Sequence, residues 1–166
     1  MRPMRRQDRL VSDPVELKKI LDECNVCRIA YQDAEGLTIV PLNFGYMYDE
    51  TLVLYFHSAK VGRKIDAFQT PQVVAFEMDG AHRLIEGDEA CDYSYSFVSI
   101  VGNGIVSIVE EDDEKVLALK LLMKHATKYD FEITSEMAKQ VAIIRLMVSH
   151  FTGKFQIGRA SCRERV

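Results

Sequence analysis

The segment most able to bind a ligand runs from Phe56 to Lys64 and reads Phe-His-Ser-Ala-Lys-Val-Gly-Arg-Lys. The apolar pattern predicts that a strand passes here into a helix, which we expect over residues 58–69. Free N–H groups at the start of a helix attract anions. Ser58 adds a hydroxyl, and Gly62 would let a ligand approach the backbone closely. The segment predicts an anion site, with a solvated first turn and an ordinary serine cap as the alternative.

Two cations define the chemistry of this predicted site. Arginine suits bidentate contact with phosphate, and lysine adds a mobile point charge, so Arg63 and Lys64 together favour a phosphate-bearing ligand. Cations near the start of a helix oppose its dipole. A bound phosphate would remove that conflict.

The cysteines carry a weaker signal. Cys24 and Cys27 form a C-x-x-C motif, but it falls at the C-terminal end of a predicted helix, where the dipole disfavours a thiolate. A zinc site would need a second pair of ligands, and Cys91 stands alone. We therefore expect both motif thiols to be buried structural residues.

The histidines and aromatic residues allow more than one interpretation. His57 could lie beside a cofactor as a proton donor or substrate contact, or could be structural. The other three histidines lack ligands at metal spacing, and we expect them at the surface or behind the site: His82, His125 and His150. The alternating residues Tyr93, Tyr95 and Phe97 could line a pocket or pack in the core.

Strands make up most of the elements that must position these residues. A helix should start at the Asp13 cap with Pro14 in its first turn and end near Asn25. Strands over 26–31, 37–42 and 51–56 should form an antiparallel meander, with Pro41 at an edge or bulge. Further expected elements are strands over 73–78, 97–109 and 141–151, a loop over 79–90, and helices over 112–129 and 135–140.

This order predicts a mostly β fold with flanking helices, a six-stranded antiparallel split β-barrel. Residues 1–157 should form a single domain, and residues 158–166 resemble a non-native or disordered tail. Cys162 lies in that tail, and we assign it no role.

Composition excludes several classes of protein. The 166 residues carry a net charge of −4 and no long basic run, so a nucleic-acid partner is not expected. No apolar run approaches the length that spans a bilayer, so we expect no membrane partner. Four unevenly spaced cysteines indicate reduced thiols and a cytoplasmic location.

Several motifs together resemble the FMN-binding split-barrel superfamily that includes pyridoxamine-phosphate oxidase. The similarity is greatest to its nitroimidazole-resistance or nitroreductase-like branch. The matching pieces, in chain order, are Met4-Arg5-Arg6 with Asp8-Arg9, Val40-Pro41-Leu42-Asn43 with Gly45-Tyr46, Tyr55 to Lys60, Gly62-Arg63-Lys64, Ser99 to Gly104, and Thr152-Gly153-Lys154.

This resemblance implies a homodimer with FMN in a groove at the subunit interface. The flavin phosphate would be held by Ser58, Arg63 and Lys64. The segment formed by Val40, Pro41, Leu42 and Asn43 would run along the flavin ring, with Phe56 and His57 beside it and Ser99 as a polar ring contact. The partner subunit would complete the pocket.

The resemblance also limits the reaction. The C-terminal tryptophan and arginine signature of the oxidases is missing, and the chain contains no tryptophan, so oxidation of vitamin B6 is disfavoured. The expected activity is transfer of electrons from NAD(P)H to a small acceptor such as a nitroaromatic compound or quinone. The alternatives are a non-catalytic flavin- or haem-binding module and a reductase that uses the deazaflavin F420.

Overall fold

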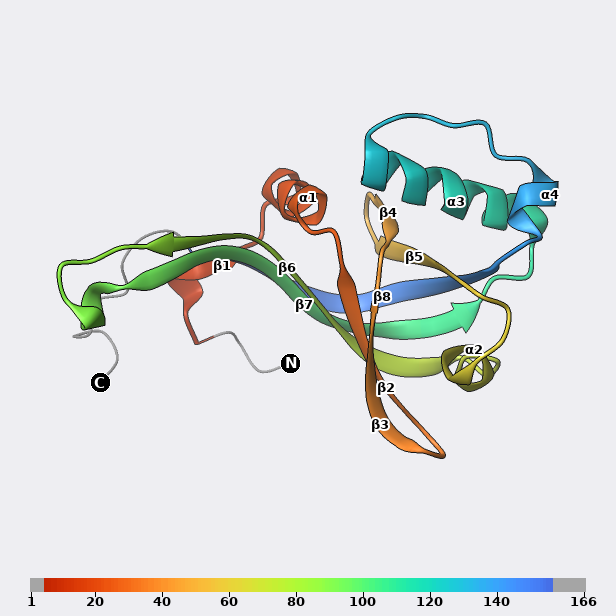
Figure 1. Ribbon diagram of the computed structural model, residues 1–166, viewed down its shortest axis with the longest axis horizontal. Helices are drawn as coiled ribbons and strands as arrows, with labels where there is room; N and C mark the ends of the chain where they lie inside the picture. The colour runs from red at the N-terminus through yellow and green to blue at the C-terminus, as the bar shows by residue number, and fades with distance from the viewer. Residues whose placement is uncertain (1–4, 157–166) are drawn as a thin grey trace.

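A computed structural model describes residues 5–156, which form one antiparallel sheet of eight strands with helices packed around it (Figure 1). Its elements, in chain order, are the 3-10 helix η1 (Gln7–Arg9), β1 (Leu10–Val11), α1 (Pro14–Glu23), β2 (Cys27–Asp33), β3 (Gly36–Leu42), β4 (Gly45–Tyr48), β5 (Leu52–Ser58), α2 (Arg63–Ala67), β6 (Gln72–Ile85), the 3-10 helix η2 (Ala90–Asp92), β7 (Ser94–Ile108), α3 (Asp112–Thr127), α4 (Ser135–Ala138) and β8 (Ala142–Gln156).

Helix α1 begins as its sequence predicts. The Asp13 carboxylate accepts a hydrogen bond from the Glu16 backbone N–H at 3.3 Å, and Pro14 takes the first helical position. Leu17, Ile20 and Leu21 are buried against the sheet. The amphipathic pattern thus attaches this helix to the β structure.

The sheet must curl because of how its two end strands are connected. Its strand order is β3-β2-β6-β7-β8-β5-β4, with β1 paired to β8, so β3 and β4 lie at opposite ends. Only Asn43 and Phe44 separate these strands in the chain. Since two residues span roughly 10 Å at most, the ends must approach each other. The result is a barrel that stays open between β3 and β4.

This arrangement corrects four expectations. The meander is wrong, because β3 pairs with β2 and β4 with β5 but β3 does not pair with β4. The strand count is eight rather than six, because β1 and β4 are separate strands. The loop expected over 79–90 is largely strand, because β6 continues to Ile85 through a bulge between Gly80 and Arg83. The last two strands, β7 and β8, are likewise longer than expected.

One main core fills the inside of the barrel. Its largest fully buried side chains are phenylalanines from the β3–β4 connection, β5, the end of α2 and β6, namely Phe44, Phe56, Phe68 and Phe76. Helix α3 covers a second, smaller core beside β5. A polar network fastens this helix to the sheet: Glu114 accepts from the Tyr55 hydroxyl at 3.0 Å and from Arg145 at 2.9 Å.

No helix in residues 5–156 is both long and apolar enough to cross a membrane. The same residues contain no group of three or more histidine, cysteine, aspartate or glutamate side chains arranged to hold a metal ion. The predicted tail over 158–166 lies outside the described residues.

Candidate functional site

The predicted phosphate site lies in the turn between β5 and α2. Ser58 is the last residue of β5 and not a helix cap, and α2 is only five residues long. The expected helix over 58–69 is therefore too long. Gly62 caps α2 with φ of 123° and ψ of 164°, a conformation that essentially only glycine adopts. So short a helix adds little dipole, and any anion binding here depends on side chains.

The Ser58 hydroxyl is the most unusual polar group of this turn. The residue is 7 % exposed, and its Oγ is buried without a hydrogen-bond partner. Leaving a polar atom buried and unpaired costs about 1–3 kcal/mol. A ligand oxygen that reached this hydroxyl would recover that loss.

Arg63 is already held by the β2–β3 hairpin. Its Nε and Nη2 donate to the two carboxylate oxygens of Asp33, each at 2.8 Å, and Nη2 also donates to the Gly36 carbonyl at 3.0 Å. This hydrogen-bonded pair lowers the pKa of Asp33 and raises that of Arg63. The Nη1 group has no hydrogen bond within the described part of the chain. Arg63 can thus stay anchored and still donate to a ligand.

Lys64 lies next to Arg63 on α2 and is half-buried. Among residues 5–156 its ammonium group forms no ion pair or hydrogen bond. A carboxylate or phosphate of a ligand would be its first anionic partner.

The predicted ring-contact residues divide between the two faces of the sheet. Val40 and Leu42 pack against the main core, and the Phe56 ring is fully buried in it. Pro41, His57 and Ser99 alternate with these positions and lie on the opposite, outward face. Asn43 follows β3 and is exposed, and its side-chain amide donates to the Asn25 carbonyl at 3.3 Å. Pro41 lies on the edge strand β3, as expected for a residue without an N–H.

Register links Ser99 to two charged neighbours on that outward face. Ser99 is opposite Asp79 of β6 and Lys154 of β8. The serine itself is 8 % exposed. A ring contact at Ser99 would therefore lie in a polar strip that crosses three strands.

The outward face also carries many exposed apolar side chains. On β3, Leu37 and Ile39 are 78 % and 65 % exposed, and Val73 of β6 is 72 % exposed. Further exposed members on neighbouring strands are Val101, Ile105 and Met147. The register sets Val73, Ile105 and Met147 side by side.

The two cysteines of the C-x-x-C motif are buried, as predicted. Cys24 and Cys27 are both fully buried and free, and Cys91 is exposed. Burial raises the pKa of the Cys24 thiol to about 12 and also raises that of Cys27. Neither thiol is thereby suited to redox chemistry.

Of the two positions expected for His125, the surface is excluded, because the residue is buried. Its ring is buried between α1 and the β3–β4 connection, with Nδ1 2.8 Å from the Phe44 carbonyl oxygen and Nε2 3.0 Å from that of Leu21. His150 is exposed as expected, and His82 is exposed with Nε2 2.8 Å from Asp79. The helical pattern did not reveal His125 because its partners lie 81 and 104 residues away.

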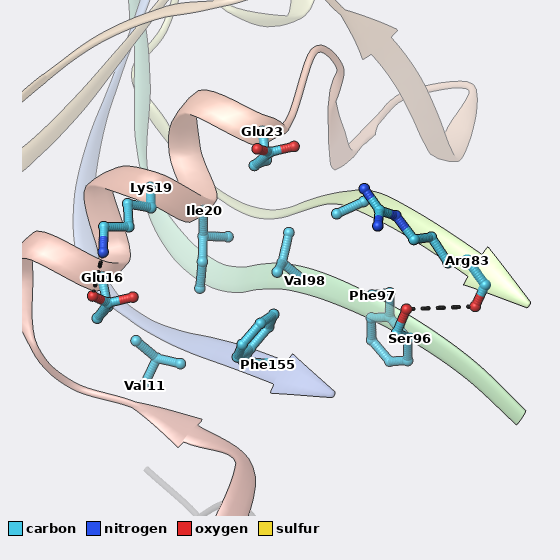
Figure 2. A pocket seen from close by; sticks show the side chains of 11 residues that line it. Val11, Glu16, Lys19, Ile20, Glu23, Arg83, Ser96, Phe97, Val98 and Phe155 are labelled. Atoms are coloured by element: carbon cyan, nitrogen blue, oxygen red, sulfur yellow. Dashed lines mark hydrogen bonds and ion pairs between the residues drawn. The ribbon is translucent and has the colours of Figure 1, made fainter. Parts of the chain in front are cut away.

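The surface pockets lie away from the predicted phosphate site. One of about 480 Å³ opens beneath α1, and Figure 2 shows Ile20, Val98 and Phe155 around it, with Glu16 paired to Lys19 at its rim. Another of about 800 Å³ lies beside His125 between α1 and α3. A third of about 500 Å³ lies at the far end of β7 and β8.

Asp33 is the site residue that sequence reasoning missed. Its carboxylate accepts a hydrogen bond from the Glu35 backbone N–H at 2.9 Å, which is ordinary turn chemistry. Its bond to Arg63 links positions 30 residues apart. No local pattern signals such a pair.

An antiparallel sheet that curls but stays open between its end strands defines the split-barrel class of proteins. A family model described as pyridoxamine 5'-phosphate oxidase matches residues 13–155, and the chain belongs to this family.

Solved structures agree with this assignment. A protein from Bacteroides thetaiotaomicron, named as a candidate 5-nitroimidazole antibiotic resistance protein, is 31 % identical, with a TM-score of 0.73 over 88 % of this chain and 86 % of that one. The flavocytochrome Anf3 from Azotobacter vinelandii and the FAD and heme binding protein from Mycobacterium smegmatis are each 15 % identical. Their TM-scores are 0.74 and 0.76, over 98 % and 94 % of this chain and 76 % and 78 % of theirs. These two show a shared fold. No curated protein matches the chain by sequence.

Proposed function

We propose that the chain binds FMN at the interface of a homodimer and passes electrons from NADH or NADPH to a small acceptor such as a nitroaromatic compound or a quinone. The buried, unpaired Ser58 hydroxyl, at the start of the turn that leads to Arg63 and Lys64, carries the proposal. When bound, FMN supplies the hydride and electron chemistry, and the protein supplies binding and orientation.

Three side chains would hold the flavin phosphate. The Ser58 hydroxyl would donate to a phosphate oxygen and so gain its missing partner. The free Nη1 of Arg63 would donate to a second oxygen while Asp33 fixes the rest of the guanidinium. Lys64 would add a positive charge without giving up an existing ion pair. Charge-assisted bonds of this kind are stronger than neutral ones.

The exposed outward face supports a homodimer. Monomeric proteins rarely leave a continuous apolar patch on a sheet, and such patches mark interfaces. The patch around Ile39, Val73 and Val101 shares its face with Pro41 and Ser99, the predicted ring contacts. A second copy covering this face would exclude water from the flavin ring.

The resistance protein that is 31 % identical favours a nitroaromatic acceptor. A non-catalytic module is the second candidate, because none of the predicted site residues is an unambiguous acid, base or nucleophile. The neighbours named for FAD and heme make FAD and haem alternative ligands, and the deazaflavin F420 is another. Because the Cys24 and Cys27 thiols are free, we place the protein in the cytoplasm.

Flavin retention after purification tests the phosphate site. We expect Ser58→Ala and the double variant Arg63→Met, Lys64→Met to lower FMN affinity by about tenfold or more each. Asp33→Asn is the matched control, because it weakens the Arg63 anchor but leaves both cations in place. If Asp33→Asn loses as much flavin as the double variant, the effect of Arg63 on flavin binding comes from its bond to the β2–β3 hairpin and not from a contact with the phosphate. Equal retention in all variants would refute the phosphate site.

The spectrum of the purified protein separates the ligands, because flavin, deazaflavin and haem absorb differently. Anaerobic mixing with NADH and with NADPH then separates an oxidoreductase from a binding module. Rapid bleaching of the flavin absorbance is expected for the oxidoreductase. A bound flavin that neither nucleotide reduces would favour the module.

A further inference from the structure

Two of the motifs in the sequence have no role in the phosphate site, and the fold brings them together. The N-terminal arginine motif and the closing Thr-Gly-Lys motif meet in the 500 Å³ pocket at the far end of β7 and β8. We call this the basic pocket, after the lining side chains Arg5, Arg6, Arg9, Lys154, Tyr93 and Tyr95. Of the described residues that line it, four are cations and none is a carboxylate.

Arg9 is largely buried, and its positive charge is only partly balanced by a nearby carboxylate. Its side chain is 16 % exposed, its Nη1 donates to Gln156 Oε1 at 2.7 Å, and its Nε lies 3.8 Å from Asp8. Asp8 is itself held by two bonds from Arg6, at 2.9 and 2.7 Å. Those bonds lower the pKa of Asp8 to about 2. Asp8 thus bonds directly to Arg6 and lies only at ion-pair distance from Arg9.

Lys154 adds a further positive charge that no carboxylate balances within residues 5–156. Its ammonium lies 4.7 Å from the centre of the Phe97 ring, a cation–π contact. Burial, and the positive charges of Arg9 and Arg6, lower the pKa of Lys154. A bound anion would relieve this repulsion, so the pocket is electrostatically prepared for one.

The other wall of the basic pocket is aromatic. Tyr93 and Tyr95 are 46 % and 56 % exposed, and Leu84 beside them is 50 % exposed. Exposed tyrosine rings offer flat surfaces on which a planar base stacks. Cations beside such rings match a nucleotide, which joins phosphates to a flat base.

The position of the basic pocket connects it to the predicted flavin. Lys154 is the direct cross-strand partner of Ser99, so the two residues share the outward face. Tyr95 lies on the same strand as Ser99, four residues or roughly 13 Å away. A ligand held by its phosphates at Lys154 could therefore reach Ser99 with its other end.

We propose that the basic pocket binds the diphosphate and adenine of the nicotinamide dinucleotide that reduces the flavin. That ligand gives up a hydride, which the flavin accepts. The identity of the ligand rests on the proposed function, whereas binding of an adenine nucleotide does not. Arg9 and Lys154 hold the phosphates, and Tyr93 and Tyr95 contact the adenine.

Calorimetric titration of the full-length protein with ADP tests the site directly. We expect Lys154→Met to weaken ADP binding about tenfold or more, because it removes a charge-assisted bond to the phosphates. Lys139→Met removes the same charge from an exposed lysine that pairs with Asp112 and Glu136, and it should leave ADP affinity unchanged. Pyrophosphate, which lacks the base, should bind more weakly than ADP.

Steady-state kinetics supply a second readout. Lys154→Met should raise the KM for NADH or NADPH with kcat and flavin content unchanged. Unchanged ADP affinity in Lys154→Met, or no binding of ADP to the unaltered protein, would overturn the site. Equal affinity for pyrophosphate and ADP would overturn its assignment to a nucleotide. A protein that binds ADP through Lys154 but holds no flavin would support the site and contradict the proposed function.

Discussion

Replacing His125 with phenylalanine tests what holds the β3–β4 connection, at the open side of the barrel, against helix α1. The imidazole lies between two backbone carbonyl groups, that of Phe44 in the β3–β4 connection and that of Leu21 in α1. Its ring also packs against the Phe44 ring, with centroids 4.4 Å apart. Phenylalanine keeps an aromatic ring at this position and removes both nitrogens.

The expected loss of stability follows from the hydrogen bonds that the imidazole ring donates. A neutral imidazole has one N–H and can donate to only one of the two carbonyl groups, whereas an imidazolium donates to both. Removing the ring leaves the buried Phe44 carbonyl without its partner, at a cost of about 1–3 kcal/mol, whereas the Leu21 carbonyl keeps a hydrogen bond from the Cys24 backbone N–H at 3.3 Å. His125→Phe should therefore lower the free energy of unfolding by about 1–3 kcal/mol.

Urea unfolding measures this loss. The protein concentration must be the same for all variants, because the apparent stability of a dimer depends on it. His150→Phe is the control, since His150 is an exposed histidine of β8. His125→Gln, which keeps one amide donor, should recover part of the loss. Flavin retention should also fall in His125→Phe, because Phe44 directly follows the predicted ring-contact residue Asn43.

If His125→Phe lowered the free energy of unfolding by less than about 0.5 kcal/mol, the effect would be that of an ordinary surface substitution. Such a result would refute the view that His125 stabilises the barrel through these carbonyl groups. The same conclusion would follow if the control lost as much stability. Either result would mean that the two carbonyl groups do not depend on this ring.

Three further predictions concern single positions elsewhere in the barrel. Gly45→Ala should cost about 1–3 kcal/mol or more in urea unfolding, because its Cβ would lie 2.4 Å from a backbone nitrogen of α3 that cannot move aside. In a Cys162→Ser background, a thiol reagent should modify Cys91 rapidly and should reach the two buried C-x-x-C thiols only when the protein unfolds. Rapid modification of all three thiols would contradict the burial of that pair. Hydrogen bonding to Arg63 lowers the pKa of Asp33, so their pair stabilises the fold above the ordinary carboxyl range. The stability difference between the unaltered protein and Asp33→Asn should therefore shrink in acid titrations as pH falls below about 4, and a constant difference would contradict the pair.

Elements with local signals were predicted well from the sequence. The Asp13 cap and Pro14 place the start of α1 correctly, because capping involves neighbours only three residues apart. The edge position of Pro41 also depends on local chemistry, because proline has no N–H to donate. Residues 79–85 were mistaken for a loop because they are polar and mostly exposed, although β7 holds them in a strand.

In the candidate site, too, the features with a local signal were predictable and those that depend on distant contacts were not. The residue types of the phosphate turn, from Ser58 to Lys64, are legible in the sequence as an anion site. The length of α2 is not, because Gly62 ends the extended turn in a conformation that the helical pattern does not reveal. The partners Asp33 and His125 depend on contacts between segments far apart in the chain, which no local pattern encodes.

The central place of β8 has a consequence for how this protein forms on the ribosome. Strand β8 pairs with both β7 and β5, so it joins β3-β2-β6-β7 to β5-β4. Until residues 142–156 leave the exit tunnel, the nascent chain holds two separate pieces of sheet with uncovered edges. Assembly of the barrel therefore waits until β8 has been made, and chaperones that shield strand edges would act during that interval.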